Sequence, residues 1–260
     1  MRRLRHLTGL HRTPSINRTL GFLLAFNAGA INAGGFLVVG MYTSHMSGFV
    51  SMLADHLVLG NLLLVGSACG VLLSFTCGAA VTAVLFNWAR VHHLRSGYAL
   101  PLLLEALLML LFGLIGGTLN HQTPFAVPVP VTVLLLAFIM GLQNAVVTKM
   151  SAAQIRTTHM TGVLTDLGIE LGKLLYWNGQ APPQSQVRAN RARLRLFTTL
   201  LGLFTVGGVV GAAGFKHIGF IWVLPLATVL LALSLPPLLG DLRRLGRMLE
   251  PEPTAPKGLD

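Results

Sequence analysis

The sequence predicts an all-α integral membrane protein: a helix bundle of six full spans plus two short or broken helices, built from two inverted repeats. Three observations support this prediction, namely the composition, the positions of the charged residues and an internal repeat. Of the 260 residues, 53% are hydrophobic and only 10% are charged, whereas a soluble domain carries about 25% charged residues. So apolar a composition is typical of a protein that is surrounded by lipid.

Six segments are long enough to cross a hydrocarbon core, which requires about 20 apolar residues. One of them contains a single charged residue, Glu105, and the others contain none. In chain order the predicted spans are Leu20–Met41, Leu62–Trp88, Ala99–Leu119, Val127–Val147, Leu196–Phe215 and Ile218–Gly240. The first is predicted to be a retained span, because a signal peptide has a shorter apolar stretch and no further spans after it.

The chain has a net charge of +11, and many of its basic residues flank these spans. Arginines fill the N-terminal tail, the loop before Leu196 and the C-terminal end: Arg2, Arg3, Arg5, Arg12, Arg18, Arg188, Arg191, Arg193, Arg195, Arg243, Arg244 and Arg247. Basic residues of this kind mark the cytoplasmic ends of membrane spans. We therefore expect the lipid bilayer, and no nucleic acid, as a partner, with both termini in the cytoplasm.

An internal repeat divides the chain into two related halves. "LLAFNAGAINA" at 23–33 and "LLAFIMGLQNA" at 135–145 share seven of eleven residues, among them Asn32 with Asn144. Further on, "YTSHMSG" at 42–48 matches "RTTHMTG" at 156–162, and "FTCG" at 75–78 matches "FTVG" at 204–207. The predicted organisation is a basic tail over 1–19, a first repeat over 20–119, a linker over 120–131, a second repeat over 132–240 and a C-terminal tail over 241–260.

Each half also contains one segment of ambiguous depth, Ser47–Gly60 and Thr161–Trp177. As helices they would be about 21 and 26 Å long, short of a core of about 30 Å. If both crossed, the protein would have eight spans and parallel halves. If neither crosses, six spans remain, and Arg90, Arg95, Lys149 and Arg156 lie inside with only Lys216 outside among the loop cations, which fits the positive-inside rule better. Three spans per half would then invert the second half relative to the first.

Small residues recur at every fourth position of two predicted spans: Gly66, Gly70, Ser74, Gly78 and Thr82 in one, Gly207 and Gly211 in the other. This spacing lets membrane helices approach closely. We interpret these residues as scaffold.

The repeated phrase is the first candidate for a functional site. Ser47 and Thr161 are expected to cap the short helices, with Gly48 and Gly162 allowing close approach to the backbone. Two such helix starts meeting at the midplane would bind an anion or a carboxylate. The candidate solute-binding residues around one central cavity are Asn32, His45, Ser47, Gly48, Asn144, His159, Thr161 and Gly162. The alternative is that the phrases only cap helices and turn the chain; the two His and two Met are too few to indicate a metal site.

Carboxylates form the second set of candidates, because a charge within the bilayer is costly and usually functional. Asp55, Glu105, Asp166 and Glu170 are the candidate coupling or intramembrane charges. Asp166 and Glu170 lie one turn apart, with Lys173 close enough to neutralise one of them. The alternatives are a solvated interfacial face for this trio and, for Glu105, a side chain that extends toward the end of its span.

The phrases "NAGAINAGGFLVVGMYTSHMSG" and "MGLQNAVVTKMSAAQIRTTHMTGVLTDLG" resemble the YoaK family of uncharacterised bacterial multi-pass membrane proteins, over roughly residues 20–240. The resemblance implies a bacterial inner-membrane protein and carries no established activity. From the inverted repeat we expect a small-solute transporter or channel. The alternative is a membrane protein that binds a partner or lipid without transport. No enzyme and no cofactor are expected, since no nucleophile with a base, metal motif or phosphate loop is present. Substrate, coupling ion and oligomeric state stay open.

Overall fold

A computed structural model describes residues 14–94, 96–119, 131–151, 155, 157–179 and 182–249. The described residues form helices and contain no strand. In chain order the helices are α2 (Pro14–Val39), α3 (Met46–Val58), α4 (Leu62–Val91), α5 (Ala99–Leu119), α6 (Val131–Met150), α7 (Met160–Leu175), η1 (Pro183–Ser185), α8 (Arg191–Ile218), η2 (Gly219–Trp222) and α9 (Val223–Leu249). The predicted all-α membrane bundle is therefore confirmed, with helices close to each predicted segment.

Five continuous helical stretches are long and apolar enough to cross a membrane. The fifth, Arg191–Leu245, contains both α8 and α9, which a turn at Gly219 separates. Gly219 has a φ of 74° and a ψ of −151°, a conformation that favours glycine over any residue with a Cβ. Helix α2 begins at Pro14, within the predicted N-terminal tail, and α9 continues to Leu249, within the predicted C-terminal tail. The predicted linker over 120–131 lies outside the described residues except for Val131.

Helices α2 and α8 pack in parallel through glycines. A Cβ added at Gly29 would overlap the carbonyl oxygen of Phe204, and one added at Gly207 would overlap that of Phe26. Gly211 lies equally close to the backbone of Ala30. Backbone contact at three positions requires residues without side chains, which confirms the interpretation of Gly207 and Gly211 as scaffold.

Helices α4 and α6 form an equivalent parallel pair. Ser74 Oγ donates to the Leu134 carbonyl at 2.6 Å, and Thr82 Oγ1 donates to the Leu142 carbonyl at 3.1 Å. Between them, Gly78 lies against the carbonyl of Phe138, while Gly141 lies against that of Phe75. Part of the predicted small-residue ridge is thus a packing surface. Its first member, Gly66, has nothing within 4 Å of an added Cβ and does not take part.

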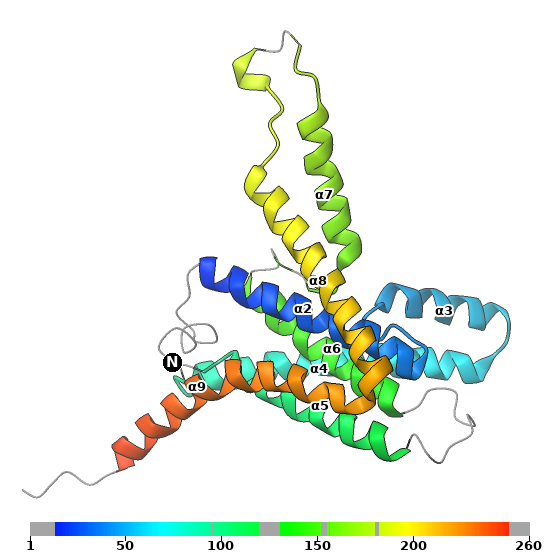
Figure 1. Ribbon diagram of the computed structural model, residues 1–260, viewed down its shortest axis with the longest axis vertical. Coiled ribbons are helices and arrows are strands. Elements are labelled where there is room, and N and C mark those ends of the chain that lie inside the picture. Colours follow the sequence, from blue (N-terminus) through cyan, green and yellow to red (C-terminus); the bar gives the residue numbers. More distant parts are fainter. Residues whose placement is uncertain are drawn as a thin grey trace, which may run out of the picture.

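Antiparallel contacts join these pairs into the bundle that Figure 1 shows. Helix α2 runs against α6, because Asn17 Nδ2 donates to the Met150 carbonyl at 3.0 Å and Gln143 Nε2 to the Leu24 carbonyl at 3.3 Å. Helix α5 runs against α9, since the Ser96 amide donates to Asp241 at 2.9 Å while Gly113, at the far end, faces Val223. Leucine, isoleucine, methionine and phenylalanine side chains of α2, α5, α6 and α9 fill the shared core.

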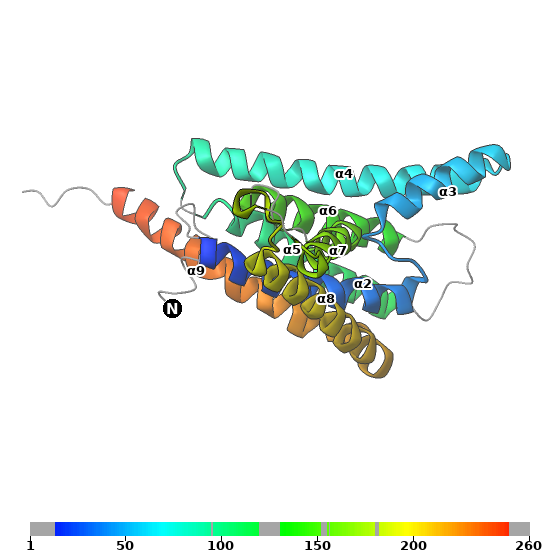
Figure 2. The same ribbon diagram turned by 90° about the horizontal axis from the view of Figure 1, so that it is seen from above.

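The two short helices lie outside this core. Helix α3 packs beside α4 at one end of the bundle, as Figure 2 shows. Helix α7 and the first part of α8 project together from the bundle as a helical hairpin (Figure 1). We call residues Met160–Asn190 together with the first turn of α8 the arm.

Candidate functional site

The first repeated phrase turns the chain between α2 and α3 around Asn32. Its Oδ1 accepts hydrogen bonds from the Ser44 amide at 3.3 Å and from Ser44 Oγ at 2.8 Å. Thr43 beside it is fully buried, and its hydroxyl has no partner among the described residues. The polar residues of the phrase thus fix the turn from inside, with Asn32 as the acceptor.

The second phrase repeats this arrangement between α6 and α7. Thr158 Oγ1 donates to Asn144 Oδ1 at 2.6 Å, and Asn144 Nδ2 donates to the Met140 carbonyl at 2.9 Å. Thr157 is fully buried without a hydroxyl partner in the described part of the chain, as Thr43 is. The repeat of sequence is therefore also a repeat of contacts. The asparagines explain the second of the two consecutive hydroxyl residues in each phrase, Ser44 and Thr158.

The prediction that Ser47 and Thr161 cap α3 and α7 is wrong. The helices begin at Met46 and Met160, so the capping positions fall on His45 and His159, neither of which makes a side-chain cap hydrogen bond. An N-cap residue needs a backbone outside the helical region, and only the histidines have it, with ψ of 68° and 61°. Ser47 and Thr161 are exposed on the first helical turn.

The glycines of the phrase make room for the histidine rings. A Cβ added at Gly48 would lie 2.8 Å from His45 Nδ1, and one added at Gly162 would lie 2.6 Å from His159 Cδ2. Each exposed ring thus folds over the first turn of its own helix. This contact gives a structural reason for the recurrence of His three residues before Gly.

The two phrases lie at different levels of the bundle. The pairs Asn17 with Met150 and Leu24 with Gln143 set the register of α2 against α6. At a rise of 1.5 Å per residue, this register separates Asn32 from Asn144 by roughly 13 Å along the helix axes. The expectation of one cavity shared by both phrases therefore has no support in this register, and each phrase is a local unit.

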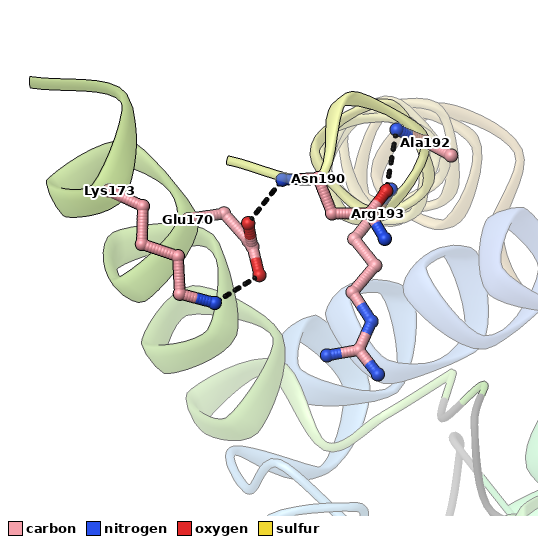
Figure 3. A network of polar contacts seen from close by, with 5 residues as sticks. All are labelled: Glu170, Lys173, Asn190, Ala192 and Arg193. Atoms are coloured by element: carbon pink, nitrogen blue, oxygen red, sulfur yellow. Dashed lines mark hydrogen bonds and ion pairs between the residues drawn. The ribbon is translucent and has the colours of Figure 1, made fainter. Parts of the chain in front are cut away.

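Three of the four candidate carboxylates belong to the outer helices. Asp55 on α3 and Asp166 on α7 are exposed. Glu170 is 3% exposed and is bound on both sides, as Figure 3 shows: Oε1 accepts from Lys173 Nζ at 2.8 Å, and Oε2 accepts from the Asn190 amide at 2.7 Å. The side chain of Asn190 in turn caps α8 by accepting from the next two amides, those of Ala192 and Arg193.

This network gives Glu170 a structural role in the arm. The hydrogen bond from Lys173 and then that from the Asn190 amide favour the ionised carboxylate, so they lower the pKa of Glu170 below its usual value. The sequence placed Lys173 near Glu170 correctly, since the two are three residues apart on one helix. It could not reveal Asn190, which approaches only because the chain turns back after α7.

We expect Glu170→Gln to loosen the junction between α7 and α8 without unfolding the bundle. Because the folded pKa is lowered, the ionised group stabilises the arm at neutral pH. That contribution is lost as the pH falls from the usual glutamate value of about 4.3 through the lowered pKa. Hydrogen exchange of the amides of residues 186–193, corrected for intrinsic rates, should be faster in the variant at pH 7 and converge with wild type in acid. Asp166→Asn, at an exposed position of the same helix, should leave the exchange unchanged. Equal protection in Glu170→Gln and wild type at pH 7 would contradict the assignment.

The fourth candidate, Glu105, lies in the core. It is 0% exposed, and neither carboxylate oxygen has a hydrogen-bond partner among the described residues. Its neighbours on the inward face of α5 are Leu102, Ala106 and Met109, all part of the core cluster. The alternative of a side chain extending to the end of its span is therefore wrong.

Two further buried polar residues accompany Glu105, and the sequence analysis missed both. Asn27 on α2 is 1% exposed and has no side-chain partner in the described part of the chain, while Gln143 on α6 is 0% exposed with a free Oε1. The sequence did offer a sign of both, because each is a polar residue inside an apolar span. The comparison of the two halves did not single them out, because Asn27 aligns with Ile139 and Gln143 with Ile31.

Comparison with known proteins adds a family and no activity. The model of a family described as a protein of unknown function, DUF1275, matches residues 20–235. The UPF0700 transmembrane protein YoaK of Bacillus subtilis (strain 168) is 27% identical over 163 residues, which cover 62% of this chain and 70% of that protein. No solved structure matches the chain.

Proposed function

The chain belongs to the DUF1275 family of multi-pass membrane proteins, and we propose from its own geometry that it is a small-solute transporter or channel. The observation that carries the proposal is the pairing of equivalent elements from the two halves. Gly29 on α2 meets Phe204 on α8, and their counterparts Gly141 on α6 and Phe75 on α4 meet in the same way. Many transporters are built from two such structurally equivalent halves.

The directions of the long helices support six crossings. Helices α2 and α8 are parallel, α4 and α6 are parallel, and α2 is antiparallel to α6. Helix α4 therefore runs opposite to α2, and α3 between them starts and ends on one side. The same holds for α7 between α6 and α8. Three crossings in each half make the halves inverted repeats, and this order leaves the basic segments at the cytoplasmic ends of the spans.

The proposed solute contacts begin at the two phrases. Helices α3 and α7 start at histidines that make no side-chain cap bond. The Gly48 amide donates to the His45 carbonyl and the Met160 amide to that of Thr158, and the other amides of each first turn are proposed to bind an anion or a carboxylate. His45 and His159 are exposed beside these amides, and Asn32 and Asn144 hold the turns in place. We therefore keep Asn32, His45, Ser47, Gly48, Asn144, His159, Thr161 and Gly162 as the proposed solute-binding residues, distributed over two local sites.

A lipid-binding or partner-binding protein without transport is the second candidate, and the arm favours it. Tyr176 and Trp177 at its tip are 59% and 87% exposed, and Arg188 and Arg191 follow in the returning chain. Aromatic and basic residues together are typical of contact with the lipid headgroup layer.

Electrical and flux measurements on proteoliposomes distinguish the two candidates. The purified full chain in vesicles would be exposed to gradients of organic anions, organic cations and neutral metabolites, with protein-free vesicles as the control. Transport predicts a protein-dependent flux or charge displacement for at least one class. Thermal stabilisation by lipids or by a partner, with no flux for any class, would favour the second candidate.

We expect cysteine labelling to follow the six-crossing order. In a chain with Cys69 and Cys77 replaced by alanine, single cysteines would be placed at exposed loop or helix-end positions: His92→Cys, Gln184→Cys and His217→Cys. An impermeant maleimide added to intact cells should label only the variant at 217, and the other two should react after permeabilisation. Labelling of the variant at 92 from outside would require α3 to cross the membrane.

A further inference from the structure

We propose that Glu105, Asn27 and Gln143 form a binding site for one monovalent positive charge, a proton or a sodium-sized ion, at the centre of the bundle. The site is independent of whether the protein carries a solute, because it is argued from the core alone. It shares no residue with the proposed solute-binding set, although Gln143 directly precedes Asn144 on α6. The two repeated phrases themselves follow the ends of α2 and α6.

The three residues lie at one level. Gln143 on α6 faces Leu24 on α2, one turn before Asn27. The hydroxyl of Tyr98 at the start of α5 donates to the Lys149 carbonyl of α6 at 3.5 Å, which brings Glu105 to the level of residues 142 and 143. At 1.5 Å per residue the three positions fall within about 5 Å along the bundle axis.

They also lie on inward faces. Glu105 continues the buried stripe of Leu102 and Met109, and Asn27 continues that of Leu24 and Ile31. Gln143 stands between Met140 and Val147 on the corresponding face of α6. The apolar members of all three stripes belong to one core cluster. Helix α6 packs against both α5 and α2, which do not contact each other directly, so Gln143 lies on the helix that joins the other two.

The free atoms of these side chains suit a cation. Both oxygens of Glu105, Oδ1 and Nδ2 of Asn27, and Oε1 of Gln143 have no partner among the described residues. Only Nδ2 of Asn27 is a donor, and the other four atoms are oxygen acceptors. The amide nitrogen of Gln143 is already engaged with Leu24, so its oxygen is the atom left for a ligand. Oxygen donors bind hard cations, and buried polar groups without partners are costly. The site contains one carboxylate and two neutral amides, so its charge is balanced by a single positive charge. A monovalent ion therefore matches it better than a divalent ion.

No cationic side chain of the described residues takes this role. On the helices packed against α5, the charged residues of the described segments lie toward the helix ends: Arg90 on α4, Lys149 on α6, and Asp241, Arg243 and Arg244 on α9. The contacts of Tyr98 with Lys149 and of Ser96 with Asp241 place these groups roughly 10 Å or more along the axis from Glu105. The remaining titratable groups of the described parts of α2 and α4 include Arg18, Cys69 and Cys77. Arg18, near the start of α2, is exposed, and on α4 Cys77 is exposed and Cys69 is half-buried.

The test uses the melting temperature of the purified full chain in detergent. At constant ionic strength, sodium chloride is compared with choline chloride, and each is measured from pH 5 to pH 8. A rise of several degrees with sodium at pH 8 identifies a metal cation, whereas a rise with falling pH and no sodium effect identifies a proton. Glu105→Gln, which keeps the shape and removes the charge, should abolish either response. Asp166→Asn is the matched control and should retain it.

A second measurement does not depend on a folded variant. Dicyclohexylcarbodiimide is an apolar reagent that adds to protonated carboxyl groups in membrane interiors, and mass spectrometry locates the adduct. In the wild-type chain we expect modification of Glu105 that slows at least severalfold when sodium is added or the pH is raised. Absence of any sodium or pH response in the folded wild-type chain would overturn the proposal. An undiminished response in a folded Glu105→Gln variant would overturn it as well.

Discussion

Alanine at Gly29 or Gly141 is expected to disrupt the bundle strongly, although it adds only one methyl group. The added Cβ would overlap the carbonyl oxygen of Phe204 in one case and of Phe75 in the other. These neighbours are backbone atoms in the middle of long helices, so neither can turn aside as a side chain would. Overpacking usually costs about 1–3 kcal/mol, and more where the surroundings cannot yield. A domain is stable by only about 5–15 kcal/mol, so loss of monodisperse protein at 37 °C is the expected result.

The melting temperature and the size-exclusion profile of each variant measure this effect. Gly66→Ala on α4 and Gly202→Ala on α8 are matched controls, because an added Cβ there meets nothing within 4 Å. Alanine is favoured over glycine in a helix by about 1 kcal/mol, so these controls should be neutral or stabilising. If Gly29→Ala and Gly202→Ala behaved alike, the close parallel packing of α2 on α8 would be wrong.

The glycine positions illustrate what the sequence could predict. Spacing of four residues identified Gly78, Gly207 and Gly211 as packing residues, since small side chains on one helix face have few other uses in a membrane. The bounds of α5 were also predictable, because it begins at Ala99 and ends at Leu119 as expected. Helices α2, α8 and α9 instead extend several residues beyond the predicted spans at one or both ends. Spacing alone could not exclude Gly66, because nothing in the sequence shows where the partner helix diverges.

The candidate site was less predictable for two physical reasons. The start of a helix depends on backbone angles, which the sequence does not show. A Ser or Thr that lies one or two residues after the N-cap position therefore looks the same in the sequence as a Ser or Thr at the N-cap. Thus Ser47 was preferred over His45, although Ser44 is the hydroxyl that bonds Asn32. Recurrence in both halves is the criterion that identifies polar residues of the spans as site candidates. Asn32 and Asn144 meet this criterion, and Asn27 and Gln143 do not.

The second large effect is expected at the asparagines that hold the two phrases. Asn32→Ala removes the acceptor of the Ser44 amide and hydroxyl, and Asn144→Ala removes that of Thr158 Oγ1. A buried polar group left without its partner costs about 1–3 kcal/mol, so each variant should be clearly destabilised. Since the two sites lie roughly 13 Å apart along the axes, the double variant should lose about the sum.

Ser47→Ala and Thr161→Ala are the comparison that decides the role of the repeated phrase. Both side chains are exposed and lie within the first helical turn, and substitutions at such surface positions usually change stability by less than about 0.5 kcal/mol. We expect melting temperatures close to wild type for this pair, and faster hydrogen exchange over residues 43–48 and 157–162 only in the asparagine variants. A greater loss of stability in Ser47→Ala than in Asn32→Ala would show that the Ser47 hydroxyl caps α3 and would contradict the role of Asn32 in the turn. The expected order instead makes each asparagine the structural centre of its phrase, and leaves the exposed histidine and hydroxyl of each helix start available to a solute.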